Sequence, residues 1–377
     1  WLEDVDGGSD FGRISLQEMS TRLCGSADLF ATEPGRGAPA SINFVSCHDG
    51  FTLTDLTRYR SKHNEANGEN NNDGSSVNHS ANFGVEGVTD DPDVIAAREQ
   101  AAMNMIGMLL LSLGTPMMLA GDEFRNTQDG NNNAYCQDND ITWLKWDWMY
   151  STNKTREMRR LETVSRLVAL RKSLDLYHHE DFFTRLTQIG LLKPSSRVQW
   201  FLPDGTTPME RDWFDLGVRS FTMRLLSNSE VDVCIVVNGT ADDRTFRLPP
   251  DTHWTPKWCS AEINGRRAGH GTQVEECDLN GDTTVWTQHV PDASETVLKM
   301  VEEVAMQRTE SSTENEADTI KFAMPVTDHA ANGTSSAPRD EVSADMPDAP
   351  VDDTPDTPVD DNVWTMPALS ITLMKQV

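Results

Sequence analysis

The most informative part of this sequence is Ile42-Asn43-Phe44-Val45-Ser46-Cys47-His48-Asp49. Its first four residues form a short and mostly apolar run, which predicts a buried strand. The run ends at His48 and Asp49, two side chains that bind polar ligands. Barrel enzymes place catalytic groups at the carboxyl ends of parallel strands, but a strand that simply ends in a capping Asp is the commoner case. The pair therefore leaves both a catalytic and a structural role open.

A helix and a second strand follow. Residues 91–113 fit a helix, because Asp90 or Asp91 can cap its start, Pro92 suits its first turn and apolar residues recur close to every 3.6 positions. The chain then continues as GTPMMLAGDEF over residues 114–124, which predicts a turn, an apolar strand and an acidic tip. Strand, long loop, helix and strand in this order predict a parallel βαβ unit.

The loops around the two strands carry longer motifs than the His-Asp pair. They are DGFTL at 49–53, KHNEANGE at 62–69, NFGVEG at 82–87 and NNNAYCQDN at 131–139. With the two strands, these loops resemble the seventh and eighth barrel strands of the bacterial glycogen debranching enzymes and isoamylases, in the α-amylase superfamily. The resemblance is dense from about Ser15 to Trp148 and thinner beyond. It implies a fold of class α/β plus all-β, the C-terminal part of a (β/α)8 barrel followed by an antiparallel β-sandwich domain.

Five side chains are candidates for the site, and the resemblance implies roles for most of them. Asp49 would be the third carboxylate of the superfamily, which stabilises the cationic transition state, and an anion held near developing positive charge favours that state over the ground state. His48 would donate a hydrogen bond to the same sugar ring. The family loop allows a substrate contact for His63, and Glu123 could position residues of the cleft. Tyr135 is a candidate from its residue type, because its ring could stack on a sugar. From the residues alone, a solvated loop histidine is the default for His63, and a packed loop aromatic is nearly as good an account of Tyr135.

An acidic pair and a group of tryptophans are predicted to have structural and not catalytic roles. Neighbouring residues on a strand point to opposite faces, so Asp122 and Glu123 are poorly placed to act as a catalytic pair, and we expect them to stabilise the strand tip. Trp143, Trp146 and Trp148 could bind a glucan, but we expect them to pack the barrel end against its last helix.

Two catalytic carboxyl groups of the family have no counterpart here. Retaining hydrolysis of a glycosidic bond uses a nucleophile and an acid roughly 5 Å apart. The family nucleophile follows a Gly-x-Arg-x-Asp pattern, which Gly217-Val218-Arg219 and Gly265-Arg266-Arg267 begin and neither completes. We therefore expect the chain to be the C-terminal portion of a debranching α-1,6-glucosidase and to be inactive alone. The alternatives are an isoamylase with longer-branch specificity and a non-catalytic glucan-binding or regulatory protein.

Composition divides the chain into four predicted segments. Residues 1–177 would be the barrel portion, with its last helix at 156–176, and residues 178–300 the β-sandwich, because short strands there alternate with turn signals. Residues 301–362 are rich in Asp, Glu, Thr, Ser, Pro and Ala, which predicts an acidic disordered insertion. Residues 363–377 would supply the final strand of the sandwich, since 369–374 alternate as a strand does.

Net charge, apolar runs and cysteine content limit the kinds of partner and the location that we expect for this chain. The 377 residues carry a formal net charge of −28, which disfavours nucleic acid and anionic membranes. No apolar run approaches the ~20 residues of a membrane span. The six cysteines form no zinc-spaced cluster or dense disulfide framework, so we expect reduced thiols in a cytoplasmic protein. The resemblance implies a branched α-glucan partner, either glycogen or limit dextrin. We expect no cofactor and no metal, since the Asn-rich loop at 129–138 lacks the spacing of a calcium-binding EF-hand.

Overall fold

The computed structural model describes residues 14–31, 36–178, 184–186, 192–194, 197–227, 231–250, 253–270, 275–276, 362–367 and 370–376. The chain divides into two compact units, Trp1–Ser294 with Val359–Val377, and Glu295–Pro358. No residue of the second unit is described, so the disorder predicted for 301–362 lies outside the described residues except at Asn362. All described residues belong to the first unit.

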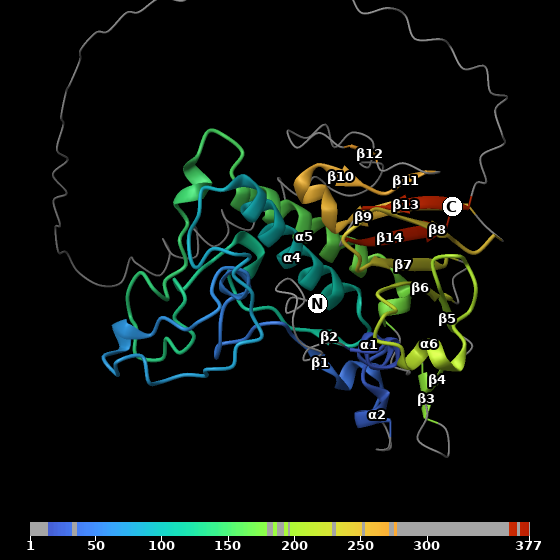
Figure 1. Ribbon diagram of the computed structural model, residues 1–377, viewed down its shortest axis with the longest axis horizontal. Helices are drawn as coiled ribbons and strands as arrows, with labels where there is room; N and C mark the ends of the chain where they lie inside the picture. The colour runs from blue at the N-terminus through green and yellow to red at the C-terminus, as the bar shows by residue number, and fades with distance from the viewer. Residues whose placement is uncertain are drawn as a thin grey trace, which may run out of the picture. The chain divides into compact units, whose positions relative to one another are not determined.

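The predicted parallel unit is present near the N-terminus. Strand β1 (Ile42–Asn43) pairs in parallel with β2 (Thr115–Pro116), and helix α4 (Pro92–Leu111) lies between them in the sequence (Figure 1). Both strands are only two residues long, and β2 is the one partner of β1 among the described residues. The prediction of a buried strand was wrong, because Ile42 is 60% exposed and Phe44 54% exposed, with no described strand on their open side. A two-stranded sheet does not establish a barrel.

Helix α4 starts where the sequence predicts. The carboxylate of Asp91 accepts hydrogen bonds from the backbone N–H groups of Asp93, at 2.9 Å, and Val94, at 3.4 Å, so Asp91 and not Asp90 is the cap. Against our expectation from the sequence, α4 has the length and mean hydropathy, 1.2, of a membrane-crossing helix. Its most apolar stretch is 56% buried within the protein, which is equally typical of a core helix.

A second long helix packs on α4. Helix α5 (Arg156–Lys172) begins at the cap Thr155 and ends four residues before the predicted limit, where a 3-10 turn (Asp175–His178) takes over. Arg171 near its end donates to the backbone carbonyls of Leu110, Ser112 and Gly114, at the end of α4 and the start of the β2 turn. A cation bonded to the last carbonyls of a helix satisfies groups that have no partner within the helix. This contact joins the two helices to the parallel strand pair.

The antiparallel sheets predicted after residue 178 are also present. Five strands run in the order β5-β6-β7-β14-β9, and β14 lies between β7 and β9 (Figure 1). Their bounds are Val198–Phe201, Ser220–Leu225, Val233–Asn238, Ser370–Gln376 and Trp254–Cys259. A three-stranded sheet has the order β11 (Gly269–His270), β13 (Val363–Met366) and β8 (Arg244–Arg247). Two further pairs join β3 (Thr184–Leu186) to β4 (Leu192–Pro194) and β10 (Arg266–Arg267) to β12 (Glu275–Glu276).

Alternate residues of the five-stranded sheet enter two different cores. Val233, Ile235 and Val237 of β7 belong to the core that also contains residues of α1 (Leu16–Leu23), α4 and α5. Cys234 and Val236 belong to the core shared with the three-stranded sheet. This follows from the two-residue period of side chains along a strand, and it explains why the first five residues of β7 are all apolar.

One glycine allows α4 to lie close to this sheet. A β-carbon at Gly107 would lie 2.8 Å from the Trp258 ring of β9, a separation that real side chains do not adopt. The short elements that remain are α2 (Ala27–Phe30), α3 (Leu53–Leu56), α6 (Glu210–Phe214) and the 3-10 helices Ala38–Ala40, Glu65–Asn67, Asp122–Phe124, Asp147–Tyr150 and Ser260–Asn264.

Candidate functional site

The loop after β1 is tied at both ends to one buried carboxylate. Asp122, which is 2% exposed, accepts a hydrogen bond from the Ser46 hydroxyl through Oδ2 and from the Leu53 backbone N–H, at 2.9 Å, through Oδ1. Burial raises the pKa of Asp122 to about 6, although both hydrogen bonds oppose the shift. Asp122 begins a 3-10 helix and not the strand tip that the sequence predicts. Its role is nevertheless structural, because it positions the loop that carries His48 and Asp49.

The His48 and Asp49 side chains point into solvent. Their side chains are 87% and 78% exposed, and His48 Nε2 lies 3.4 Å from Asp49 Oδ2. The next residue fixes the loop to a second one, since the Gly50 N–H donates to the Asn132 carbonyl at 3.0 Å. The two side chains are thus held side by side on a braced loop and remain open to a ligand.

Two buried asparagines join the loops that carry the longer motifs. Asn64 Nδ2 donates to Asn132 Oδ1 at 2.9 Å, and the Asn132 backbone N–H donates back to Asn64 Oδ1 at 3.0 Å. Asn131 Nδ2 similarly donates to Asn67 Oδ1 at 2.9 Å. A β-carbon at Gly74, where φ is +73°, would lie 2.4 Å from Asn132 Oδ1, so only glycine fits against the pair. The motifs at 62–69 and 131–139 therefore form one network of amide hydrogen bonds.

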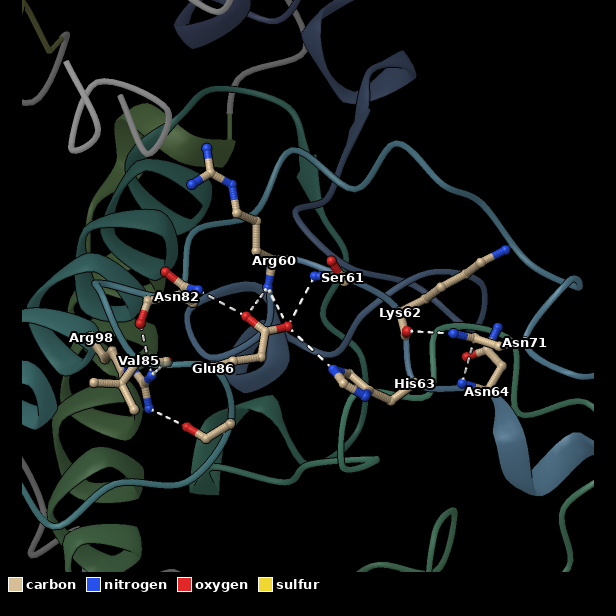
Figure 2. Close-up of polar contacts among 11 residues, drawn as sticks. Arg60, Ser61, Lys62, His63, Asn64, Asn71, Asn82, Val85, Glu86 and Arg98 are labelled. Atoms are coloured by element: carbon tan, nitrogen blue, oxygen red, sulfur yellow. Dashed lines mark hydrogen bonds and ion pairs between the residues drawn. The ribbon is translucent and has the colours of Figure 1, made fainter. Parts of the chain in front are cut away.

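His63 is held by the protein on two sides. Its backbone N–H donates to the Gly130 carbonyl at 2.8 Å, and its Nε2 lies 3.2 Å from Glu86 Oε1 (Figure 2). Glu86 also accepts from the backbone N–H groups of Arg60 and Ser61. Burial alone would raise the pKa of Glu86, but these hydrogen bonds outweigh it and lower the pKa. His63 is therefore a braced residue and not the freely solvated histidine that is the default for a loop.

Tyr135 and Glu123 differ in accessibility. The Tyr135 side chain is 71% exposed, so it does not pack within its own loop. Glu123 is partly buried, and its Oε2 accepts from the Gly121 N–H at 2.9 Å, which closes its own turn. The structure places neither residue in hydrogen-bond contact with Asp49.

The tryptophans follow the structural expectation in part. Trp146 and Trp148 pack on Phe124 with ring centroids 4.8 and 5.3 Å apart, as a packing role predicts. Trp143 donates from its ring nitrogen to Asp138 at 3.0 Å and is 55% exposed. Across the described ranges, no group of three or more His, Cys, Asp or Glu is arranged to hold a metal ion.

A buried ion cluster behind the loop was missed from the sequence. Arg160 donates to both oxygens of Glu99, at 2.6 and 2.8 Å, and Arg125 pairs with the same carboxylate. Arg160 also donates to Thr54 Oγ1 at 3.3 Å and to the Asp122 carbonyl at 3.4 Å. Burial would raise the pKa of Glu99, but the two guanidinium charges lower it. The sequence shows Glu99 only as an acidic residue near a helix start, because its partners lie 26 and 61 positions away.

Two curated proteins similar to this chain are named as a glycogen operon protein homolog and a glycogen debranching enzyme. Over 210 residues the chain is 44% identical to the glycogen operon protein GlgX homolog of Mycobacterium tuberculosis, an alignment that covers 55% of this chain and 28% of that protein. Over 270 residues it is 37% identical to the glycogen debranching enzyme of Pectobacterium atrosepticum, with 71% and 38% covered. The chain is homologous to the bacterial glycogen debranching enzymes. The resemblance based on the loop motifs is thereby confirmed, although the chain spans only about a third of these relatives' length. No family model matches the chain.

Solved structures give weaker likenesses. The pullulanase of Anoxybacillus sp. LM18-11, complexed with maltotetraose, matches with a TM-score of 0.40 and 17% identity over 69% of this chain and 29% of that one. The GBS pullulanase SAP, also in complex with maltotetraose, matches with a TM-score of 0.45 and 10% identity over 100% and 38%. Both TM-scores lie below 0.5.

Proposed function

We propose that this chain is the C-terminal portion of a cytoplasmic glycogen debranching enzyme that hydrolyses α-1,6-glucosidic branch linkages in glycogen or limit dextrin. The observation that carries the proposal is the 44% identity over 210 residues to a glycogen operon protein. The glycogen debranching enzymes that match at 37% extend the similarity to 270 residues. In this proposal the parallel strands β1 and β2 are the last two strands of a (β/α)8 barrel.

Asp49 is the proposed stabiliser of the transition state. A retaining glycosidase passes through an oxocarbenium-like state, and a fixed carboxylate close to the developing positive charge lowers its free energy. The exposure of Asp49 and His48 on a loop braced by Asp122 supports this role, because both groups are accessible and held in place. His48 donates to the same sugar ring, and the exposed ring of Tyr135 stacks on a neighbouring sugar. His63 and Glu123 complete the proposed substrate-binding set.

The nucleophile and the acid are proposed to come from a part of the enzyme outside these 377 residues. The first incomplete Gly-x-Arg-x-Asp pattern directly precedes β6, and the second overlaps β10, so both lie in the antiparallel part. A retaining mechanism needs both missing groups, and we therefore expect no hydrolysis by the chain alone.

The test compares two proteins on the same substrate. Reducing-sugar release from limit dextrin is measured for the 377-residue chain and for the chain expressed with any coding sequence upstream of it. We expect no release from the first and release of short branches from the second. Hydrolysis by the chain alone would refute the missing-carboxylate argument, whereas release of mainly long branches would favour an isoamylase.

A non-catalytic glucan-binding protein is the second candidate. The exposed aromatic rings of Tyr135 and Trp143 favour it, because such rings offer apolar faces to sugars without any catalytic group. This alternative would be established if both proteins bind maltotetraose and neither releases reducing sugar from limit dextrin.

A further inference from the structure

A cavity lined by arginines lies behind the candidate site. It has a volume of about 250 Å³ and lies between residues of α3 and the following turn, α4 and the start of α5. None of the five predicted site residues lines it. Five arginines do, namely Arg58, Arg98, Arg125, Arg156 and Arg160.

The carboxylates of the cavity wall do not balance this charge. Asp90, Glu99 and Glu157 are the acidic residues of the lining, so five positive groups face three negative ones. Glu99 is already bonded to Arg160 and Arg125. An excess of two positive charges therefore remains at one place in a chain whose net charge is −28.

Two of the arginines have a buried donor that makes no hydrogen bond within the described residues. The Nε groups of Arg98 and Arg125 are buried and make no hydrogen bond in the described part of the chain. Arg98 is 5% exposed and the Arg125 side chain 9%. Arg125 Nε lies 3.6 Å from Glu157 Oε1, which is close enough for an ion pair but too long for a hydrogen bond. A buried donor that makes no hydrogen bond is destabilising, so two of them in one wall favour the binding of an acceptor.

The remaining donors of Arg98 show how firmly it is placed. Its terminal nitrogens donate to the carbonyls of Gly87, at 2.6 Å, Asn82, at 2.7 Å, and Val85 (Figure 2). By contrast, the side chains of Arg58 and Arg156 make no hydrogen bond or ion pair among the described residues. The cavity thus combines a rigid arginine with two that are free to turn toward a ligand.

Two further observations agree with a need for negative charge. Burial lowers the pKa of Arg125 to about 10, and the charges of Arg160 and Arg58 add to the shift while Glu99 opposes it. Burial and the Arg58 charge likewise lower the pKa of Arg98. In addition, Arg156 and Glu157 are the first residues of α5, where backbone N–H groups lack partners within the helix and the helix dipole is positive.

We propose that this cavity binds a small oxyanion, a phosphate group that is either free or carried by a small molecule, between Arg58, Arg98, Arg125 and Arg156. Planar guanidinium groups bind phosphate oxygens through two parallel hydrogen bonds, which suits a wall of several arginines. The volume is below the ~300 Å³ at which pockets for drug-sized ligands begin, so the ligand is small. The site is separate from Asp49 and does not depend on the proposed function.

The experiment is a calorimetric titration of the 377-residue chain with inorganic phosphate at constant ionic strength, with chloride as the balancing anion. We expect saturable binding of phosphate and none of chloride. Arg156→Gln should weaken binding about tenfold and Arg58→Gln with Arg156→Gln about 100-fold, because each charged hydrogen bond contributes independently. Arg159→Gln on the same helix is the matched control, since Arg159 does not line the cavity, and should bind as the unmodified chain does.

The same titration separates the two sources of phosphate. A monosaccharide phosphate that binds at least tenfold more tightly than inorganic phosphate, with no binding of the plain monosaccharide, would identify a carried group. Absence of phosphate binding by the unmodified chain would overturn the proposal. Unchanged affinity in Arg156→Gln, an exposed position whose substitution leaves the core intact, would overturn it as well.

Discussion

The loops around Asp49 and the five-stranded sheet are held together by different forces. In β7 all six residues are buried, and its side chains enter apolar cores on both faces. In the loops, Asn64 and Asn132 are also buried, but amide hydrogen bonds hold them. Apolar burial has no direction and follows the area removed from water, whereas an amide pair requires both partners in one geometry. The sheet therefore supplies stability, and the loops supply the positions of polar groups.

The largest stability effect should come from the sheet. Leu373 of β14 is fully buried between β7 and β9, and Leu373→Ala should lower the free energy of unfolding by about 3 to 4 kcal/mol through lost burial and the cavity left behind. Denaturant unfolding measures this. Lys375→Ala, on the same strand but partly exposed, should change it by less than about 0.5 kcal/mol. Equal effects would mean that β14 does not contribute to a core.

The largest functional effect should come from the loops. In a catalytically competent form of the protein, Asp49→Asn should lower kcat by about 10²-fold or more and leave the melting temperature unchanged, because the side chain is exposed. Asp140→Asn, a second exposed loop aspartate, is the control and should retain full kcat. Near-normal kcat in Asp49→Asn would reduce Asp49 to a strand cap.

The pH dependence of stability should report on Asp122. Its pKa is raised from 3.8 to about 6, so between these values the folded chain binds more protons than the unfolded one, and stability falls as pH rises from about 4 to about 6. Asp122→Asn keeps a similar shape and should remove this fall, which is on the order of 3 kcal/mol. Denaturant unfolding at several pH values measures the difference. An identical pH profile in the variant would show that Asp122 is not buried as the structure has it.

Breaking the amide pair should open the loops without unfolding the sheet. Asn132→Ala keeps the backbone N–H that donates to Asn64 Oδ1 but removes Asn132 Oδ1, the acceptor of Asn64 Nδ2, which should cost about 1 to 2 kcal/mol locally. Hydrogen exchange at Gly50 and His63 should then speed up about tenfold, while exchange in β7 stays unchanged. Asn139→Ala, at an exposed position of the same loop, is the comparison and should leave exchange at both residues as it was. Faster exchange in β7 would show that the two regions are not separable.

Substitution of an exposed tyrosine should have the smallest effect on stability. Tyr135→Ala should change the free energy of unfolding by less than about 0.5 kcal/mol but weaken maltotetraose binding severalfold, if the ring stacks on sugar. Titration calorimetry of Tyr135→Ala against Tyr150→Ala, which replaces a still more exposed tyrosine, tests this. The same affinity in both variants would remove Tyr135 from the substrate-binding set.

Local signals in the sequence located most regular elements. The cap and proline at 91–92 predict the start of α4 because they act within one helical turn, and β-branched residues at 231–238 predict β7. The prediction that was wrong concerns burial, which depends on other segments of the chain that pack against a residue. Burial of Ile42 and Phe44 was expected from their apolar character, but no described strand covers them. The predicted division into four segments and the roles of the five site residues stay predictions.

The family resemblance, the parallel order of β1 and β2 and the position of the His-Asp pair all follow from residues close together in the chain. The packing of the site does not. Asp122 holds Ser46 and Leu53 across 76 and 69 positions, and Arg160 reaches Glu99 across 61. Buried carboxylates and guanidinium groups are stable only with partners, and those partners come together only when α4, α5 and the loops pack. Sequence patterns record periodicity and turns, whereas the bracing of Asp49 and the arginine cavity exist only in the folded chain.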